Sequence, residues 1–427
     1  MIYHGDIFYC KDLTDFIAIK DGYIIVDAEN RIVDVCSAIP ERYEREPVRD
    51  HNNKLIIPAF CDIHLHSSQL VNTGLGYDFP FEEWLIKYTN PAERQYADLA
   101  KAEAINKRLI NQLWYYGSMH SVIMGSTDAL SALNLMKHYD KSGMRAYIGK
   151  MNADVAAFGD QAEDSERSVE ETRLLAEEAK KLSDSVFCCV SPEFVPNCSD
   201  RLLMRLGELA AEYSLPVQSH LSEGEADVQA VKDRYPELSY SQVYLKYQLF
   251  GQTSTVMAHA IYTSKEERTL IKERNVTVAH CPIALSNIPS GKTMPLREFL
   301  EDGVNIGLGS DIGGGHTLNM MRVIEQTVHY SKFQQFIDGS KPLSILEAFA
   351  LATLGGGKVF GEVGSFQPRY HFDALVIDDE ELSPEAAGYD IKERVERFLY
   401  EGNAGLIQER YCHGKKVDKP FPDIIPK

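Results

Sequence analysis

Basic side chains are scarce in this sequence. It holds 44 lysine and arginine residues against 63 aspartate and glutamate residues, which gives a formal net charge of -19. Phosphate groups are bound by faces rich in lysine and arginine, so we expect neither nucleic acid nor an anionic membrane surface as a partner. The acidic balance itself requires no explanation beyond solubility.

Long apolar segments and paired cysteines are also missing. No run of about 18 apolar residues occurs, so we expect no transmembrane helix. The first residues, from Met1 to Asp6, contain neither a basic nor an apolar stretch, and we therefore expect no signal peptide. The eight cysteines show no CxxC spacing, and several lie inside apolar runs, where cysteine acts as a small hydrophobic residue. A reducing, cytoplasmic location is the expectation that follows.

What the sequence does contain is a regular alternation. Between residues 55 and 360, short apolar runs alternate with longer stretches rich in Ala, Leu, Glu and Lys, for example 166–182 and 201–213. Apolar strands that alternate with helices are typical of a parallel sheet covered by helices. Eight such units predict an α/β fold, a (β/α)8 TIM barrel. The strands are expected at 55–57, 121–124, 145–148, 186–190, 216–219, 255–258, 276–279 and 304–308.

Both ends of the chain lack this alternation. Gly22–Val26 and Arg31–Val35 near the start, and Phe372–Ile377 near the end, have the composition of β-strands. We therefore expect a small β-sandwich domain assembled from both termini. The predicted boundaries are 1–57 for its N-terminal part, 58–365 for the metal-dependent catalytic barrel and 366–427 for its C-terminal part.

Residue types that commonly bind metals, His and Asp, occur at several of the predicted strand ends. His64 and His66 follow the first strand, and residues two apart in an extended segment point to the same side, so both imidazoles can reach one ion. His220 follows the fifth strand and Asp311 the eighth, at the end of the barrel where active sites are built. Three imidazoles and a carboxylate suit a divalent metal such as Zn²⁺ or Fe²⁺.

Other polar residues fall near the same strand ends. Glu223, three residues after His220, is placed to move a proton between water and substrate, or alternatively to stabilise a helix N-terminus. His259 ends the sixth strand and is interpreted as an active-site residue, with a hydrogen-bonded core histidine as the alternative. For His280, at the end of the seventh strand, and His120, just ahead of the second, packing is the favoured interpretation.

These motifs resemble the amidohydrolase superfamily, and within it the guanine deaminases, over nearly the whole chain. The most specific similarity lies in Asp78-Phe79-Pro80, Glu83-Trp84-Leu85 and Lys87-Tyr88-Thr89-Asn90-Pro91-Ala92-Glu93. Further similar segments are Pro58–Gln69, Gln218–Glu223, Val256–His259, Gly307–Asp311 and Leu351–Gly356. The resemblance implies hydrolysis of guanine to xanthine and ammonia, in guanine catabolism, by an enzyme that is usually a homodimer.

The resemblance also implies roles for single residues. One zinc ion, which lowers the pKa of a bound water, would be held by His64, His66, His220 and Asp311. Asp311 would accept a proton from that water, Glu223 would protonate the adjacent ring nitrogen, and His259 would orient the hydroxide or stabilise the tetrahedral intermediate. Substrate contacts would come from Gln69, Trp84, Glu193, Phe194 and His220. The fourth strand ends without the lysine that two-metal relatives carry there, which favours a single ion.

Two positions depart from the guanine deaminase pattern. Glu193 stands where those enzymes carry an arginine that donates to acceptor atoms of the purine, whereas an ionised carboxylate only accepts. Ile283-Ala284-Leu285 replaces an Asn-Ser-Asn segment. If Glu193 faces the pocket and not elsewhere, the alternative substrate is another amino-heterocycle: a pterin, another aminopurine or an aminotriazine. The remaining alternative is an inactive scaffold barrel, but such relatives usually lose metal ligands that this chain retains.

Overall fold

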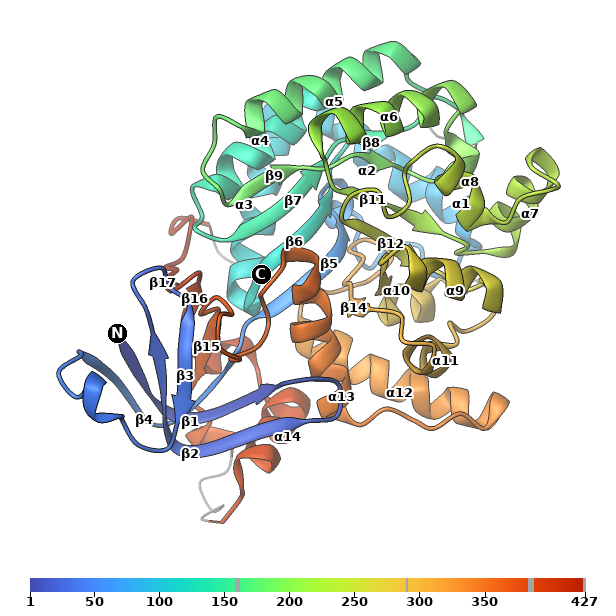
Figure 1. The fold of residues 1–427 in the computed structure, drawn as a ribbon. Helices are drawn as coiled ribbons and strands as arrows, with labels where there is room; N and C mark the ends of the chain where they lie inside the picture. Colours follow the sequence, from blue (N-terminus) through green and yellow to red (C-terminus); the bar gives the residue numbers. More distant parts are fainter. Residues whose placement is uncertain (158–161, 289–290, 383–387, 425–427) are drawn as a thin grey trace.

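The computed structural model describes residues 1–157, 162–288, 291–382 and 388–424 (Figure 1). Two four-stranded parallel sheets form its centre. The first contains, in spatial order, β5 (Phe60–His66), β6 (Ser118–Met124), β7 (Arg145–Gly149) and β9 (Val186–Cys188). The second contains β11 (Val217–Leu221), β12 (Thr255–His259), β13 (Thr277–His280) and β14 (Ile306–Leu308).

The two sheets meet at both edges. On one side Val190 and Val217 form a parallel bridge, and the backbone N–H of Val190 donates to the carbonyl of Pro216 at 2.8 Å. On the other side the backbone N–H of Asp311 donates to the carbonyl of His64 at 2.9 Å. The parallel strands therefore enclose a barrel, as the alternation of strands and helices predicts. A short parallel pair follows β7 and β9, formed by β8 (Met151–Asn152) and β10 (Ser191–Pro192).

Helices cover the outside of the barrel (Figure 1). The side chain of Asp164 caps α5 (Ser165–Ala179) and that of Ser199 caps α6 (Asp200–Tyr213), each accepting a backbone N–H in the first turn. Both helices lie close to the stretches that the sequence predicts. The other helices are α1 (Phe81–Trp84), α2 (Asn90–Arg94), α3 (Leu99–Tyr116), α4 (Ala129–Asp140), α7 (Glu225–Arg234), α8 (Tyr240–Lys246), α9 (Lys265–Glu273), α10 (Pro282–Asn287), α11 (Leu296–Glu301), α12 (Met320–Asp338), α13 (Ile345–Ala350) and α14 (Ile391–Glu401).

Strands from both ends of the chain form one seven-stranded sheet. Its order is β17 (Lys415–Lys416), β16 (Ile407–Cys412), β15 (Ala374–Ile377), β4 (Val48–Pro58), β1 (Ile2–Cys10), β2 (Phe16–Val26) and β3 (Ile32–Cys36). The sheet buries a cluster of its own in which Tyr3 stacks on Phe372 at 4.0 Å between ring centroids. Strands from both termini thus share one hydrogen-bonded sheet, whereas the sandwich form of the predicted domain and its boundaries at residues 57 and 366 stay predictions.

One predicted barrel strand is wrong. Residues 55–57 belong to β4 of the terminal sheet, where Leu55 pairs with Ile377, and the first barrel strand is β5. Every residue from Leu55 to His66 is buried, so no change of periodicity separates the two strands. His64 and His66 consequently lie within the end of a strand and not beyond it.

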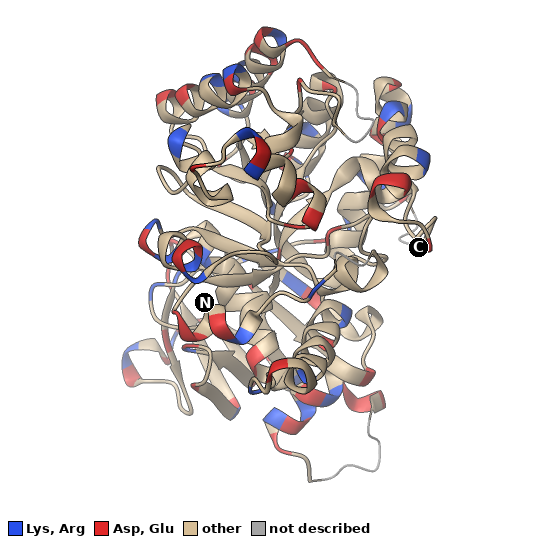
Figure 2. Ribbon diagram, turned by 90° about the vertical axis from the view of Figure 1, so that its right-hand side faces the viewer, with Lys and Arg blue, Asp and Glu red and all other residues tan. Residues whose placement is uncertain are grey.

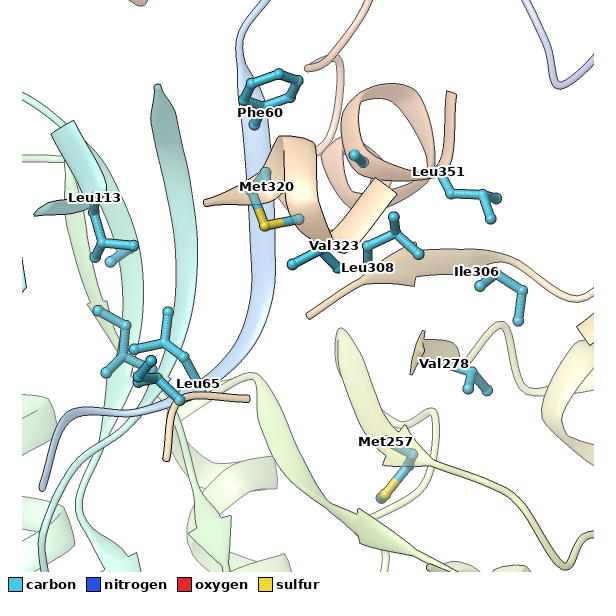
Figure 3. Packing of buried hydrophobic residues seen from close by; sticks show 14 of the residues in the cluster. Phe60, Leu65, Leu113, Met257, Val278, Ile306, Leu308, Met320, Val323 and Leu351 are labelled. Atoms are coloured by element: carbon cyan, nitrogen blue, oxygen red, sulfur yellow. The ribbon is translucent and has the colours of Figure 1, made fainter. Parts of the chain in front are cut away.

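The space between the barrel strands and the helices is filled by apolar side chains. Figure 3 shows Ile306 and Leu308 of β14 near Val323 of α12 and Leu351, all of them members of one buried cluster. Charged residues lie mainly on the outer helices and loops (Figure 2). Within the described ranges, no helix has both the length and the apolar character needed to cross a membrane.

Candidate active site

The four predicted metal ligands converge at the C-terminal ends of the barrel strands. His64 and His66 end β5, His220 lies on β11, and Asp311 follows β14. The Nε2 atoms of His66 and His220 are 3.1 Å apart, and Oδ1 of Asp311 lies 3.4 Å from Nε2 of His64 and 3.6 Å from Nε2 of His66. All four side chains are buried. Three separate strands thus bring these groups to one point.

This set of donors fits a divalent cation. Nε2 of His64 is buried and has no hydrogen-bond partner among the described residues. The backbone carbonyl of Glu193, 2.6 Å from Nδ1 of His220, accepts the proton on that nitrogen, so that Nε2 of the same ring keeps its lone pair. An unpartnered imidazole nitrogen, two close Nε2 atoms and a carboxylate form a group that a shared ion satisfies, and Zn²⁺ accepts each of these ligand types.

Two further titratable groups lie beside this cluster. Nε2 of His259 is 3.4 Å from Oε1 of Glu223 and 3.8 Å from Oδ2 of Asp311. The carboxylate of Asp227 accepts the backbone N–H of Glu223 at 3.2 Å and that of Gly224 at 2.6 Å, which fixes this turn. Burial and the nearby Asp311 carboxylate raise the pKa of Glu223 well above its usual value. Glu223 therefore keeps its proton at a pH where an ordinary glutamate is ionised.

The backbone is strained at three of these strand ends. The φ angles of Ser222, His259 and Asp311 are 49°, 74° and 48°. Residues other than glycine rarely adopt this left-handed conformation, and each instance costs roughly 1–3 kcal/mol, which the surrounding structure must offset. Such conformations gather at active sites, and here they occur at or next to the polar groups that converge.

A pocket opens beside the polar cluster. Its polar wall is formed by His66, His220, Glu223, His259 and Asp311. The rest of the lining consists of Gln69, Phe81, Trp84, Leu85, Glu193, Phe194, Ala284, Ile288 and Gly314. The indole N–H of Trp84 donates to the carbonyl of Leu75 at 3.0 Å, which holds the ring in place. A flat, partly polar ligand is the shape that such a lining accommodates.

Gln69 is held by a residue that the sequence analysis assigned no role. Its Nε2 atom donates to Oε1 of Glu93 at 3.1 Å, and the hydroxyl of Ser68 donates to the same oxygen at 3.1 Å. Glu93 therefore orients the amide that lines the pocket. The signal was present, because Gln69 and Glu93 both lie in segments similar to guanine deaminases, but their contact arises only from tertiary folding.

The other lining residues that the sequence analysis missed are mostly apolar. Phe81 and Leu85 flank Trp84 within about one helical turn, so the helical spacing of this stretch could have indicated them. Ile288 and Gly314 come from loops after β13 and β14, and no local pattern marks them. Ala284 also lines the pocket. It lies in the segment Ile283-Ala284-Leu285, which departs from the guanine deaminase pattern.

Glu193 borders the pocket as well. It is buried, and its carboxylate accepts a hydrogen bond from Nδ2 of Asn197. The substitution at this position therefore bears on the pocket and not on a remote loop. Glu193 is thus a pocket-lining residue that can only accept hydrogen bonds when ionised, whereas the resemblance implies a donor at this position.

Comparisons with known proteins identify the family of this chain. The Amidohydrolase family matches residues 55–417. The guanine deaminase of Homo sapiens is 36% identical over 388 residues, covering 88% of this chain and 85% of that protein. The guanine deaminase of Escherichia coli K12 is 31% identical over 379 residues, covering 87% and 84%.

Solved structures lead to the same family. The crystal structure of guanine deaminase from C. acetobutylicum, with guanine bound in the active site, is 39% identical and has a TM-score of 0.93. The match covers 98% of this chain and 99% of that one. The resemblance found in the motifs is thus confirmed, and this chain belongs to the Amidohydrolase family.

Proposed function

We propose that this chain catalyses the zinc-dependent hydrolysis of guanine to xanthine and ammonia. The observation that carries the proposal is that the Glu223 carboxyl shares one pocket with His66, His220 and Asp311. A proton donor beside a metal-type cluster is what removal of an amino group from a ring by water requires. The guanine deaminases described above support guanine as the substrate.

The four converging side chains would hold the ion, which when bound supplies a water of lowered pKa. Asp311 would accept a proton from that water, and His259, 3.8 Å from its Oδ2, would orient the attacking oxygen. Glu223 would donate its proton to the ring nitrogen beside the amino-bearing carbon. The proton held by Asp311 would then pass to the departing amino group, and the hydroxyl proton of the intermediate would return to Glu223 as the carbonyl forms, so that ammonia leaves and the neutral product keeps the water oxygen.

The apolar lining would position the ring. Phe81, Trp84 and Phe194 offer aromatic surfaces for a flat heterocycle. One N–H of the Gln69 amide is engaged by Glu93, and the remaining N–H and carbonyl oxygen would meet the edge of the base. Exclusion of water by these walls would strengthen each polar contact.

A single ion is part of the proposal. The chain after β9 runs Val190-Ser191-Pro192-Glu193-Phe194, and no lysine lines the described pocket to bridge a second ion. Zinc is proposed over iron because three imidazoles and one carboxylate form a ligand set that zinc commonly takes. Metal analysis of the purified protein, together with activity after reloading with each metal alone, distinguishes the two.

The test is ammonia release from a panel containing guanine, other aminopurines, pterins and aminotriazines, with zinc-loaded protein. Guanine should be the compound that is turned over with the highest kcat/KM. If guanine is inert while another ring turns over, the reaction class stands and guanine is the wrong substrate. If no compound turns over and no metal is bound, the chain is the inactive scaffold.

Glu193 supports a second candidate, the deamination of a related amino-heterocycle. Glu193 lines the pocket, and an ionised carboxylate only accepts hydrogen bonds, which would favour an N–H edge on the ligand over a carbonyl. Pterins, other aminopurines and aminotriazines present such edges. The same panel therefore separates the two candidates by their ratio of kcat/KM values.

A cytoplasmic homodimer completes the proposal. All eight cysteines are free thiols, which supports a reducing compartment. On α12, Phe333, Phe336 and Ile337 are 66%, 82% and 68% exposed, and an apolar patch of this kind is typical of a protein interface. Light scattering should give the mass of a dimer, and Phe336→Glu should shift it toward the monomer.

A further inference from the structure

A second group of metal-binding side chains lies where the barrel meets the terminal sheet. His120 is on barrel strand β6, Asp373 directly precedes β15, and His413 lies in the turn between β16 and β17. One ligand atom from each of the three lies within 4.8 Å of the other two. Nε2 of His120 is 3.8 Å from Oδ2 of Asp373, which is too long for a direct hydrogen bond.

The polar atoms of this group are buried without partners. Both ring nitrogens of His120, Oδ2 of Asp373 and Nε2 of His413 make no hydrogen bond within the described part of the chain. His120 is 0% exposed and Asp373 is 1% exposed. Two further groups act on the Asp373 carboxyl: the guanidinium of Arg145, on the neighbouring strand β7, and the thiol of Cys412, a weak donor. Buried polar groups without partners destabilise the folded chain, so a cluster of them indicates a ligand that they share.

We propose that His120, Asp373 and His413 hold a structural Zn²⁺ ion. Zinc bonds of about 2.0–2.1 Å place tetrahedral ligand atoms about 3.3 Å apart, so these side chains need to draw together only slightly. Two imidazole nitrogens and one carboxylate oxygen are ordinary zinc ligands, and a water would take the fourth position. The site uses none of the groups that line the substrate pocket.

The surroundings of the three side chains orient them for this task. Oδ1 of Asp373 accepts the backbone N–H of His413 at 2.5 Å, which leaves Oδ2 for the ion. The ring of His371 stacks on that of His413 at 3.6 Å between centroids and fixes its plane. Hydrogen bonds and ring contacts to the ligand side chains commonly set the orientation of metal ligands.

The ion would join two parts of the fold. His120 belongs to the barrel, whereas Asp373 and His413 belong to strands or turns of the terminal sheet. A metal bond between them would act as a cross-link that stabilises the folded chain. Because this site lies apart from the pocket, the inference does not depend on which reaction the pocket catalyses.

The test counts zinc in the full chain. Protein stripped with a chelator, reloaded with Zn²⁺ and desalted should contain about two ions per chain, one in each site. His413→Asn should contain about one, since an amide is a poor zinc ligand. Asparagine tolerates the positive φ of 47° at this position, so the turn should persist. His4→Asn, on β1 of the same sheet but outside the cluster, is the matched control and should keep both.

One ion per chain in the unaltered protein, or two in His413→Asn, would overturn the proposal. A second measurement does not depend on any variant. Crystals of the zinc-loaded protein should give an anomalous peak between His120, Asp373 and His413 at the zinc absorption edge. Ordinary water density there would show that solvent, not metal, joins these groups. A metal in the proposed catalytic site would give a separate anomalous peak. The crystal therefore distinguishes a failure of the structural zinc proposal from a failure of the proposed catalytic site.

Discussion

The backbone carbonyl of Glu193 lies 2.6 Å from Nδ1 of His220, so a residue of the pocket wall also orients a proposed metal ligand. This contact uses the main chain, whereas the Glu193 carboxylate interacts with Asn197. The two contributions can therefore be separated, because a change of side chain leaves the carbonyl in place. Substrate preference can vary at this position while the metal centre is preserved.

Glu193→Arg should raise the preference for guanine and leave the metal content unchanged. Arginine donates to the acceptor atoms of the purine, whereas glutamate can only accept. The ratio of kcat/KM for guanine to that for the best other heterocycle should rise about tenfold or more, equivalent to about 1.4 kcal/mol. Glu193→Gln, which removes only the charge, is the control and should show a smaller change. An unchanged ratio in Glu193→Arg would contradict this role.

Glu223→Gln should retain its metal and lose turnover. The amide keeps the size of the side chain but cannot donate a proton in the same way, so kcat should fall by roughly 10²–10⁴-fold. The exposed Glu225, at the start of α7, provides the control, because Glu225→Gln alters a neighbouring carboxylate outside the pocket lining. Steady-state kinetics with metal analysis gives the answer, and near-normal kcat in Glu223→Gln would remove this residue from proton transfer.

Trp84→Ala should weaken substrate binding with little effect on the metal. The indole lines the pocket, and its loss removes both contact area and ring stacking, so KM should rise about tenfold. Trp84→Phe keeps a ring but loses the N–H that donates to the Leu75 carbonyl. Its KM should lie between that of the unaltered protein and that of Trp84→Ala. Equal KM values in all three proteins would show that the ring does not contact the substrate.

Asp227 should make the stability of the fold depend on pH. Burial raises its pKa from 3.8 to about 6. A raised folded-state pKa gives stability that is present below about pH 4 and is lost as the pH rises through 6. The free energy of unfolding of the unaltered protein should therefore fall by about 2.4 kcal/mol relative to Asp227→Asn between pH 4 and 7. Parallel curves for the two proteins, measured by denaturant unfolding, would contradict this assignment.

Much of the barrel and its polar centre could be predicted, because each feature has a local signal. An apolar run followed by His64 and His66 marks a strand end, and the positions of His220 and Asp311 follow the same rule. The first strand was misplaced because burial is continuous through Pro58, where two sheets meet without a helix between them. Periodicity cannot divide a segment that is buried on every side.

Contacts between distant segments could not be predicted. Ile288 joins the pocket wall from a loop, and no spacing relates it to Trp84. His120 lies close to Asp373 and His413, which are far along the chain, and no local pattern relates the three residues. A single sequence indicates the secondary structure that each segment favours. Which distant residues come together depends on how the segments pack.

The most direct test of the proposed reaction is to incubate zinc-loaded protein with guanine in ¹⁸O-labelled water and to measure both products. We predict xanthine that carries one labelled oxygen, together with an equal amount of ammonia, because water supplies the oxygen that replaces the amino group. The absence of labelled xanthine, from protein that contains its metal and is folded, would contradict the account.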